Sequence, residues 1–161
     1  MKFLIAGAGA IGGYLGARMA QAGQDGTLYA RGPHLRAMQE RGLRVIGDEG
    51  EFEVRPRIVG DLKEAGPMDV IFLGVKAHGV TALAPQLKPL IGETTTIVST
   101  QNGIPWWYFQ AVSPDIAGEF AGMRLESVDP GGVIAAAISP TNAYSPSTGG
   151  RMICTWCAGG A

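Results

Sequence analysis

The sequence predicts an α/β fold organised around a doubly wound parallel sheet. Three observations predict this fold. Strand-like and helix-like segments alternate over residues 1–138, the first strand leads into a glycine-rich turn, and residues 69–75 are apolar almost throughout. Alternating strands and helices are typical of a parallel sheet, and a strand that is apolar on both faces is typical of a sheet covered by helices on both sides.

The opening segment is the most informative part of the chain. Residues 1–6 form the first expected strand, and Gly7-Ala8-Gly9-Ala10-Ile11-Gly12 follows it directly as a G-x-G-x-x-G motif. Residues 13–23 then have the pattern of a helix that ends at Gly23. The order of strand, glycine turn and helix is that of a Rossmann-type dinucleotide-binding unit.

Each glycine of this motif has its own expected role. Gly7 permits the tight turn, Gly9 lets a pyrophosphate approach the backbone, and Gly12 lets the helix pack closely on the strand. Free amides and the helix dipole at the start of the helix favour phosphate charge. The alternative is a glycine-rich turn without a ligand. The expected cofactor-binding loop consists of Gly7, Ala8, Gly9, Ala10, Ile11 and Gly12.

The end of the second expected strand, residues 27–30, indicates which dinucleotide the loop would bind. A site for NAD usually has Asp or Glu there to bind the ribose 2′-hydroxyl, whereas this chain has Arg31. A carboxylate would repel a 2′-phosphate, and a guanidinium can bind it through paired hydrogen bonds. Arg31 therefore favours NADP as the cofactor, and the alternative is a solvated surface arginine.

The middle of the chain predicts a short helix and a hairpin. The helix is expected at residues 34–41, and Gly42 ends it. Residues 43–46 and 51–54 have the apolar content and alternation of two paired strands. Residues 57–59 are expected to extend this hairpin.

The next three elements return to the main sheet. Residues 69–75 form the apolar strand, and residues 94–100 are rich in β-branched side chains and form the strand after it. Between them, residues 80–90 are expected to be helical. Pro85 lies inside that segment and implies either a late start of the helix or a kink.

The pattern becomes weaker after Gly103. Residues 104–109 form an aromatic cluster, which fits the wall of a binding cleft, an apolar patch that awaits a partner, or ordinary core packing. Residues 133–138 fit either a further strand or the start of a helix. From Ser139 onward Ser, Pro, Thr and Gly predominate, which is typical of an irregular tail.

Composition excludes several classes of function. The chain has 161 residues, a 46% apolar fraction and a net charge of −1, which suit one domain with no general attraction to nucleic acid or to an anionic membrane. No segment predicts a membrane span or a signal peptide. Two cysteines cannot form a disulfide-dense secreted scaffold, so a cytoplasmic protein is expected.

The two cysteines, Cys154 and Cys157, form a C-x-x-C pair within the glycine-rich tail. A redox pair would be expected between a strand and a helix start, and a tetrahedral zinc site would need two further ligands. We therefore expect neither redox chemistry nor a metal site.

In combination, the motifs resemble the ketopantoate reductase (2-dehydropantoate 2-reductase) family over roughly residues 1–138. The resemblance rests on GAGAIGGYLGARMAQAG at 7–23, YAR at 29–31, FLGVKAH at 72–78 and TQNGIP at 100–105. It implies an oxidoreductase that uses NADPH to reduce 2-dehydropantoate, or a related 2-keto acid, to the 2-hydroxy acid. In that family the reaction is a step of pantothenate biosynthesis.

The resemblance also implies roles for individual residues. Residues 7–12 match the pyrophosphate loop, and Arg31 matches the arginine that holds the 2′-phosphate. Lys76 matches a lysine at the same phosphate region, and Asn102 matches an asparagine near the nicotinamide and the substrate. The alternatives are a surface lysine at a strand end and a turn-forming Asn-Gly pair. These stretches all follow expected strands, and the carboxyl ends of strands are where open α/β sheets bind ligands.

The resemblance divides the chain into an NADP-binding domain at 1–138 and an unmatched tail at 139–161. The family's second, helical domain carries its general acid and is expected to be absent here, through truncation or a shifted reading frame, so no catalytic residue is predicted. A non-catalytic NADP-binding remnant is the alternative function. Without that domain Trp106, Trp107 and Phe109 are expected to be exposed, and such a surface favours a homo-oligomer.

Overall fold

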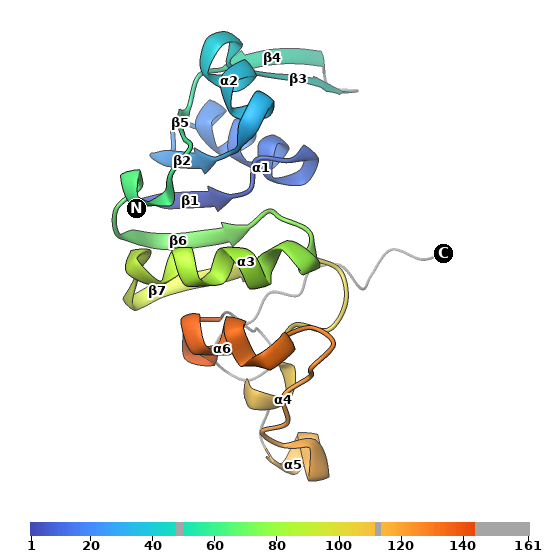
Figure 1. Cartoon of the computed structure of the whole chain (residues 1–161). Helices are drawn as coiled ribbons and strands as arrows, with labels where there is room; N and C mark the ends of the chain where they lie inside the picture. Colours follow the sequence, from blue (N-terminus) through green and yellow to red (C-terminus); the bar gives the residue numbers. More distant parts are fainter. Residues whose placement is uncertain (48–49, 112–113, 144–161) are drawn as a thin grey trace.

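The computed structural model describes residues 1–47, 50–111 and 114–143 (Figure 1). Within these residues the main sheet has five strands, all parallel, in the order β5-β2-β1-β6-β7. The expected doubly wound α/β fold is therefore confirmed. The strands are β1 (Phe3–Ala6), β2 (Gly26–Tyr29), β5 (Arg57–Val59), β6 (Met68–Leu73) and β7 (Ile91–Ser99).

Helices cover both faces of this sheet. On one face the side chains of β1 at Phe3 and Ile5 pack with residues of α1 (Ala10–Gln21) and α2 (Gly32–Arg41). On the other face Leu4 and Ala6 belong to a cluster that includes α3 (Ala77–Leu87) and α6 (Val133–Ala137). Successive side chains of a strand point to opposite faces, so a strand covered on both sides must be apolar throughout.

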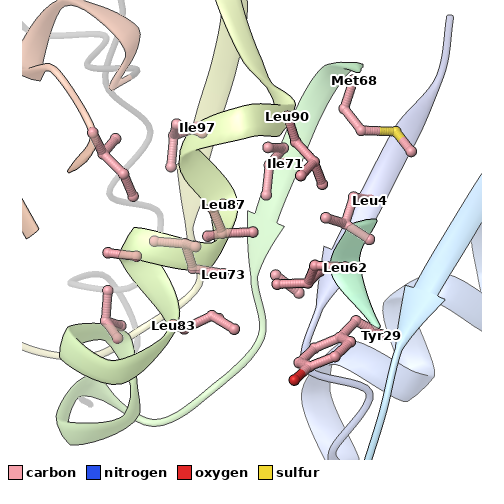
Figure 2. Close-up of a cluster of buried hydrophobic side chains, with 14 of the residues drawn as sticks. Leu4, Tyr29, Leu62, Met68, Ile71, Leu73, Leu83, Leu87, Leu90 and Ile97 are labelled. Atoms are coloured by element: carbon pink, nitrogen blue, oxygen red, sulfur yellow. The ribbon is translucent and has the colours of Figure 1, made fainter. Parts of the chain in front are cut away.

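The larger of the two clusters lies between the sheet and α3 (Figure 2). Leu83 and Leu87 of α3 meet Ile71 and Leu73 of β6, and Ile97 of β7 continues the same layer. All five side chains are at most 3% exposed. This buried layer fixes the position of α3, whose first residues lie beside the carboxyl ends of β6 and β7.

A second sheet, next to α1 and α2, is the hairpin of β3 (Leu43–Gly47) and β4 (Gly50–Val54). The prediction that residues 57–59 extend it is wrong. They form β5, which pairs parallel with β2 and buries Val59 at the edge of the main sheet. Pro56 lies between the two segments, and a proline cannot donate a hydrogen bond to a hairpin ladder.

Two helices begin earlier than the sequence indicated. α1 begins at Ala10, so the last three residues of the glycine motif form its first turn, and it ends just before the left-handed Gly23. α3 begins at Ala77, and Pro85 lies inside it, so the expected late start is wrong. Residues 133–137 form α6, which decides between the strand and helix alternatives for that segment.

The segment after β7 contains only short helices, among them α4 (Tyr108–Ala111) and α5 (Pro114–Ala117). The first residues of the expected irregular tail are ordered. Residues 140–142 form a 3₁₀ turn, and Ala143 pairs with Ile97 on the outer edge of β7. The rest of that tail, with Cys154 and Cys157, lies outside the described residues.

Within the described part of the chain, no helix combines the length and the apolar character that crossing a membrane would require.

Candidate functional site

The strands of the main sheet end side by side, and the predicted site residues follow these ends. Ala6 of β1 is in register with Tyr29 of β2 and Leu73 of β6, and Leu73 is in register with Ser99 of β7. With about 4.8 Å between neighbouring strands, β2 to β7 spans roughly 14 Å. Along this edge, Arg31, Gly7, Lys76 and Asn102 therefore follow one another in that order.

The turn after β1 is closed by direct contact between backbones. Gly7 has φ of +116°, a conformation that favours glycine, and a Cβ on Gly12 would lie 2.1 Å from the carbonyl oxygen of Gly7. A Cβ on Gly74, after β6, would lie 2.4 Å from the same oxygen. The start of α1 and the β6 loop therefore pack on Gly7 so closely that none of the three positions accepts a side chain. Sequence reasoning missed Gly74, although its place directly after an apolar strand is a signal for such packing.

Gly9 differs from its two neighbours in the motif. It is the N-cap of α1 with φ −74° and ψ −161°, a backbone conformation that any residue adopts. A Cβ added there would meet no atom within 4 Å. Neither backbone strain nor a protein contact requires glycine at this position, so the open space above Gly9 is available to a ligand that touches the backbone.

The start of α1 offers donors to such a ligand. The backbone N–H groups of Ala10, Ile11 and Gly12 have no acceptor among the described residues. The first turn of α1 has no acidic side chain, and Gly9 has no side chain to cap the helix. Unpaired amides and the positive end of the helix dipole together favour an anion at this point.

Arg31 follows the carboxyl end of β2, at one end of this row. It is the N-cap of α2, and its side chain is exposed. Within the described ranges the guanidinium forms neither a hydrogen bond nor an ion pair. Its charge is therefore available to an anion beside β2, at the position where an NAD site would have a carboxylate.

Lys76 and Asn102 follow the neighbouring strands β6 and β7. Two hydrogen bonds tie their loops together: Thr100 Oγ1 donates to the carbonyl of Leu73 at 2.8 Å, and Gln101 Nε2 donates to that of Val75 at 2.8 Å. The side chains of Lys76 and Asn102 are both exposed. Sequence reasoning missed the two tethers, which are the polar residues directly before Asn102 in the TQN segment.

Beyond Asn102 the structure forms a pocket of about 70 Å³. Its walls come from the start of α3, the loop at 101–107 and α6. The lining includes Asn102 and the apolar side chains of Val80, Ile104, Trp106, Trp107 and Ile134.

The prediction that Trp106 and Trp107 are exposed is wrong. They are only 3% and 2% exposed, and their rings meet edge to face with centroids 4.1 Å apart. Both belong to the cluster that includes residues of α3 and α6, so the chain itself covers them. Phe109 is half-buried and packs near Phe120, at 5.6 Å between ring centroids.

Asp129 holds the α6 wall of the pocket in place. Its carboxylate is fully buried and accepts hydrogen bonds from the backbone N–H groups of Ile134, at 2.7 Å, and Ala135, at 3.1 Å. Sequence reasoning missed this residue. The signal was the turn-forming Asp-Pro-Gly-Gly segment directly before the apolar run at 133–138.

Comparison with known proteins agrees with this geometry. The family model described as Ketopantoate reductase PanE/ApbA matches residues 3–106. A 2-dehydropantoate 2-reductase from Mesorhizobium japonicum is 47% identical over 141 residues, and an uncharacterized oxidoreductase, YkpB, from Bacillus subtilis is 31% identical over 103 residues. A crystal structure from Ralstonia solanacearum assigned to the ketopantoate reductases superimposes with a TM-score of 0.79 at 41% identity.

The matches cover much of this chain but less than half of each relative. The Mesorhizobium alignment spans 87% of this chain and 42% of that protein, and the Bacillus alignment spans 64% and 34%. The Ralstonia superposition spans 88% of this chain and 42% of that structure. The family model alone covers more than half of the 161 residues. The chain therefore belongs to the ketopantoate reductase family, a family of NAD(P)H-dependent oxidoreductases.

Proposed function

We propose that this chain is the NADPH-binding part of a reductase that converts 2-dehydropantoate, or a related 2-keto acid, to the 2-hydroxy acid. One observation supports the proposal most strongly. Unpaired amides, a guanidinium, an ammonium group and a side-chain amide follow four strands that end in register along one edge of the sheet. An extended dinucleotide needs such a row of groups, and open α/β sheets bind it at this edge.

The phosphates would lie at the β2 and β1 end of the row. The amides of residues 10–12 would hold the pyrophosphate over Gly9, whose missing side chain leaves the backbone accessible. Arg31 would bind the 2′-phosphate through paired, charge-assisted hydrogen bonds, which is the reason to propose NADP rather than NAD. Lys76, one strand further, would add charge to the same region.

The reacting groups would lie at the β7 end. When bound, the reduced nicotinamide supplies the hydride. Asn102 would orient the carboxamide of the nicotinamide and the substrate through its side-chain amide. The tethers at Thr100 and Gln101 would hold that asparagine beside Lys76. The small-molecule 2-keto acid, the step of pantothenate biosynthesis and a cytoplasmic location stay predictions from the resemblance and the composition.

A non-catalytic NADP-binding module is the rival proposal. The chain spans 42% of the length of the Mesorhizobium reductase. Among the described residues, Lys76 is the lysine that lies in the row of groups along the edge of the sheet. If Lys76 binds phosphate, this row contains no other ammonium group that could protonate the alkoxide. We therefore expect no turnover of 2-dehydropantoate by the 161-residue chain alone.

Two measurements test these proposals. Calorimetric titration of the 161-residue chain should show NADPH binding more tightly than NADH, and equal affinities would contradict the role of the 2′-phosphate. The absorbance of NADPH in the presence of 2-dehydropantoate should stay constant. Turnover would contradict the assignment of Lys76 to phosphate, and Lys76→Ala would then be expected to abolish it.

A further inference from the structure

His34 lies at the start of α2, next to the arginine proposed for the 2′-phosphate. Arg31 is the N-cap of α2 and Gly32 is its first residue, so His34 is the third residue of the helix. The side chains at these two positions of a helix start are neighbours, as the capping box shows. Both side chains are exposed, and the first turn of α2 contains no acidic residue. An anion bound by Arg31 would therefore lie within reach of the imidazole.

The imidazole of His34 is available to a ligand. Among residues 1–47, 50–111 and 114–143 it forms neither a hydrogen bond nor an ion pair. The residue lines an open groove of about 440 Å³ between α2 and the β3–β4 hairpin. The other charged groups along this groove are Arg41 of α2 and Arg44 and Glu53 of the hairpin, and none of the lining comes from β5.

These charges give the surroundings of His34 a positive excess. Glu51 binds Arg44, so the guanidiniums of Arg31 and Arg41 are the ones left without a partner in the part of the chain that the structure describes. Glu53 is the one carboxylate that lines the groove. An excess of positive charge attracts an anion to this end of the row.

We infer that His34 is a second contact for the 2′-phosphate of NADP, beside Arg31, and that it makes the affinity for NADP rise as the pH falls from 8 to 6.5. The inference rests on the proposed function, because that function supplies the 2′-phosphate. A phosphate dianion between the two side chains favours the protonated imidazole, since a nearby opposite charge stabilises a charged group. Binding would therefore take up a proton from the solvent onto the ring of His34.

The sign of the pH dependence distinguishes His34 from the phosphate itself. Histidine is the side chain that changes charge between pH 5 and 8. A phosphate monoester gains a proton near about pH 6 and then carries less charge. With Arg31 as its only contact, the 2′-phosphate would thus bind equally well or more weakly as the pH falls. A rise in affinity requires a protein group that becomes positive over the same range.

The first test is calorimetric titration of the 161-residue chain with NADP⁺ and with NAD⁺ at pH 8 and pH 6.5. NADP⁺ should bind about two- to fivefold more tightly at pH 6.5, the range of an exposed ion pair. NAD⁺ should show no such change, because it has no 2′-phosphate. Titrations in buffers of different ionisation enthalpy should show proton uptake with NADP⁺ only. Equal pH dependence for the two cofactors would overturn the inference.

The second test removes the titrating group. His34→Gln keeps a polar side chain of similar size, and it should abolish both the rise in NADP⁺ affinity and the proton uptake. The matched control is His78→Gln, because His78 is the other histidine of the chain and is also exposed near a helix start. This variant should keep both effects. Their persistence in His34→Gln, or their loss in His78→Gln, would overturn the inference.

The third test observes the imidazole directly by NMR in the parent chain, so it does not depend on the folding of a variant. The pH at which the His34 ring signal titrates should rise with adenosine 2′,5′-bisphosphate and should stay unchanged with AMP. The His78 signal is the internal reference. A His34 signal that titrates at the same pH with both ligands would overturn the inference.

The design separates this inference from the proposed function. If NADP⁺ binds more tightly than NAD⁺ but without a contribution from His34, the proposed function stands and the inference is wrong. If neither cofactor binds, both are wrong.

Discussion

The two ends of the candidate site are built from different kinds of groups. At the phosphate end, the groups that matter are backbone amides at residues 10–12 and the missing side chains of Gly7, Gly9 and Gly12. At the pocket end, the groups are side chains of Asn102, Trp106 and other residues brought from separate segments.

This difference determines how each end can fail. The phosphate end depends on close contact between backbones, so one added methyl group can disrupt it. The pocket end depends on hydrogen bonds that hold a loop and a short helix in place, among them the bonds accepted by Asp129. Removal of a single side chain is therefore expected to loosen the pocket without changing the phosphate end.

The largest expected effects separate two glycines of the same turn. Gly12→Ala places a Cβ 2.1 Å from the carbonyl oxygen of Gly7, so we expect the free energy of unfolding to fall by about 3 kcal/mol or more. Gly9→Val meets no protein atom near its Cβ, and we expect a loss of about 1 kcal/mol, because valine is a poorer N-cap than glycine.

NADPH affinity should distinguish the same two positions. The Gly9→Val chain should remain folded but lose at least about 100-fold in affinity, close to 2.7 kcal/mol, because the side chain fills the space where the pyrophosphate would approach. Urea unfolding and thermal melts with and without NADPH measure both quantities. Normal stabilisation of Gly9→Val by NADPH would refute the proposed position of the pyrophosphate.

The next effect concerns the pocket end. Asp129→Ala removes two hydrogen bonds from buried backbone N–H groups to a carboxylate, so the free energy of unfolding should fall by about 2 to 3 kcal/mol. NADPH affinity of the folded chain should stay within about twofold of the parent, a change below roughly 0.5 kcal/mol. The exposed Asp115 is the control, and Asp115→Ala should change neither quantity. A large loss of NADPH affinity in Asp129→Ala would show that the two ends are coupled.

The cation at the phosphate end should have an effect on one cofactor only. Arg31→Ala should weaken NADPH binding about ten- to a hundredfold, which corresponds to the loss of about 1.5 to 3 kcal/mol from charge-assisted contacts. NADH binding should barely change. Arg36→Ala on the same helix is the matched control, since Arg36 is also exposed. Titration of both cofactors measures the difference, and equal losses for the two would exclude a 2′-phosphate contact.

The smallest effect lies in the hairpin, away from both ends. Arg44 donates hydrogen bonds to Glu51, and this contact lowers the pKa of the Glu51 carboxyl below its usual value of 4.5. A carboxyl with a lowered pKa in the folded state stabilises that state above its unfolded pKa, and the contribution is lost as the pH falls through the folded pKa. We expect a slight loss of stability below about pH 4.5.

An NMR titration of the Glu51 carboxyl measures this directly. Arg44→Met should return the pKa of Glu51 toward its usual value and should leave NADPH affinity at neutral pH unchanged. An unchanged pKa of Glu51 in the variant would show that the contact with Arg44 is not its cause.

The same contrast explains what the sequence could predict. The strand, glycine turn and α1 were predictable because their pattern is contained in residues 1–23. To predict that Gly7, Arg31, Lys76 and Asn102 lie in one row, it was enough to assume that parallel strands end at the same edge of the sheet. The register of the strands agrees with this assumption. The roles of these residues stay predictions.

The pocket end was not predictable in the same way. Burial of Trp106 and Trp107 depends on α3 and α6, and the sequence left open whether residues 133–138 form a strand or a helix. Two hydrogen bonds across 26 or 27 residues, from Thr100 and Gln101, also place the loop, and spacing alone does not indicate them. The prediction that residues 57–59 extend the hairpin was wrong because these residues pair with β2, which is distant in sequence, and not with the neighbouring hairpin strand.

The segment at the outer edge of β7 limits how two copies of this chain could associate. Ala143 pairs with Ile97 there, and Asn142 donates to the carbonyls of Gly92 and Thr95, at 3.2 and 3.0 Å. Strand addition between proteins needs an unpaired edge, and at this edge Asn142 and Ala143 already occupy part of β7. The opposite edge, β5, has only three residues, which offers little length for pairing. Joining the five-stranded sheets of two copies into one continuous sheet is therefore disfavoured.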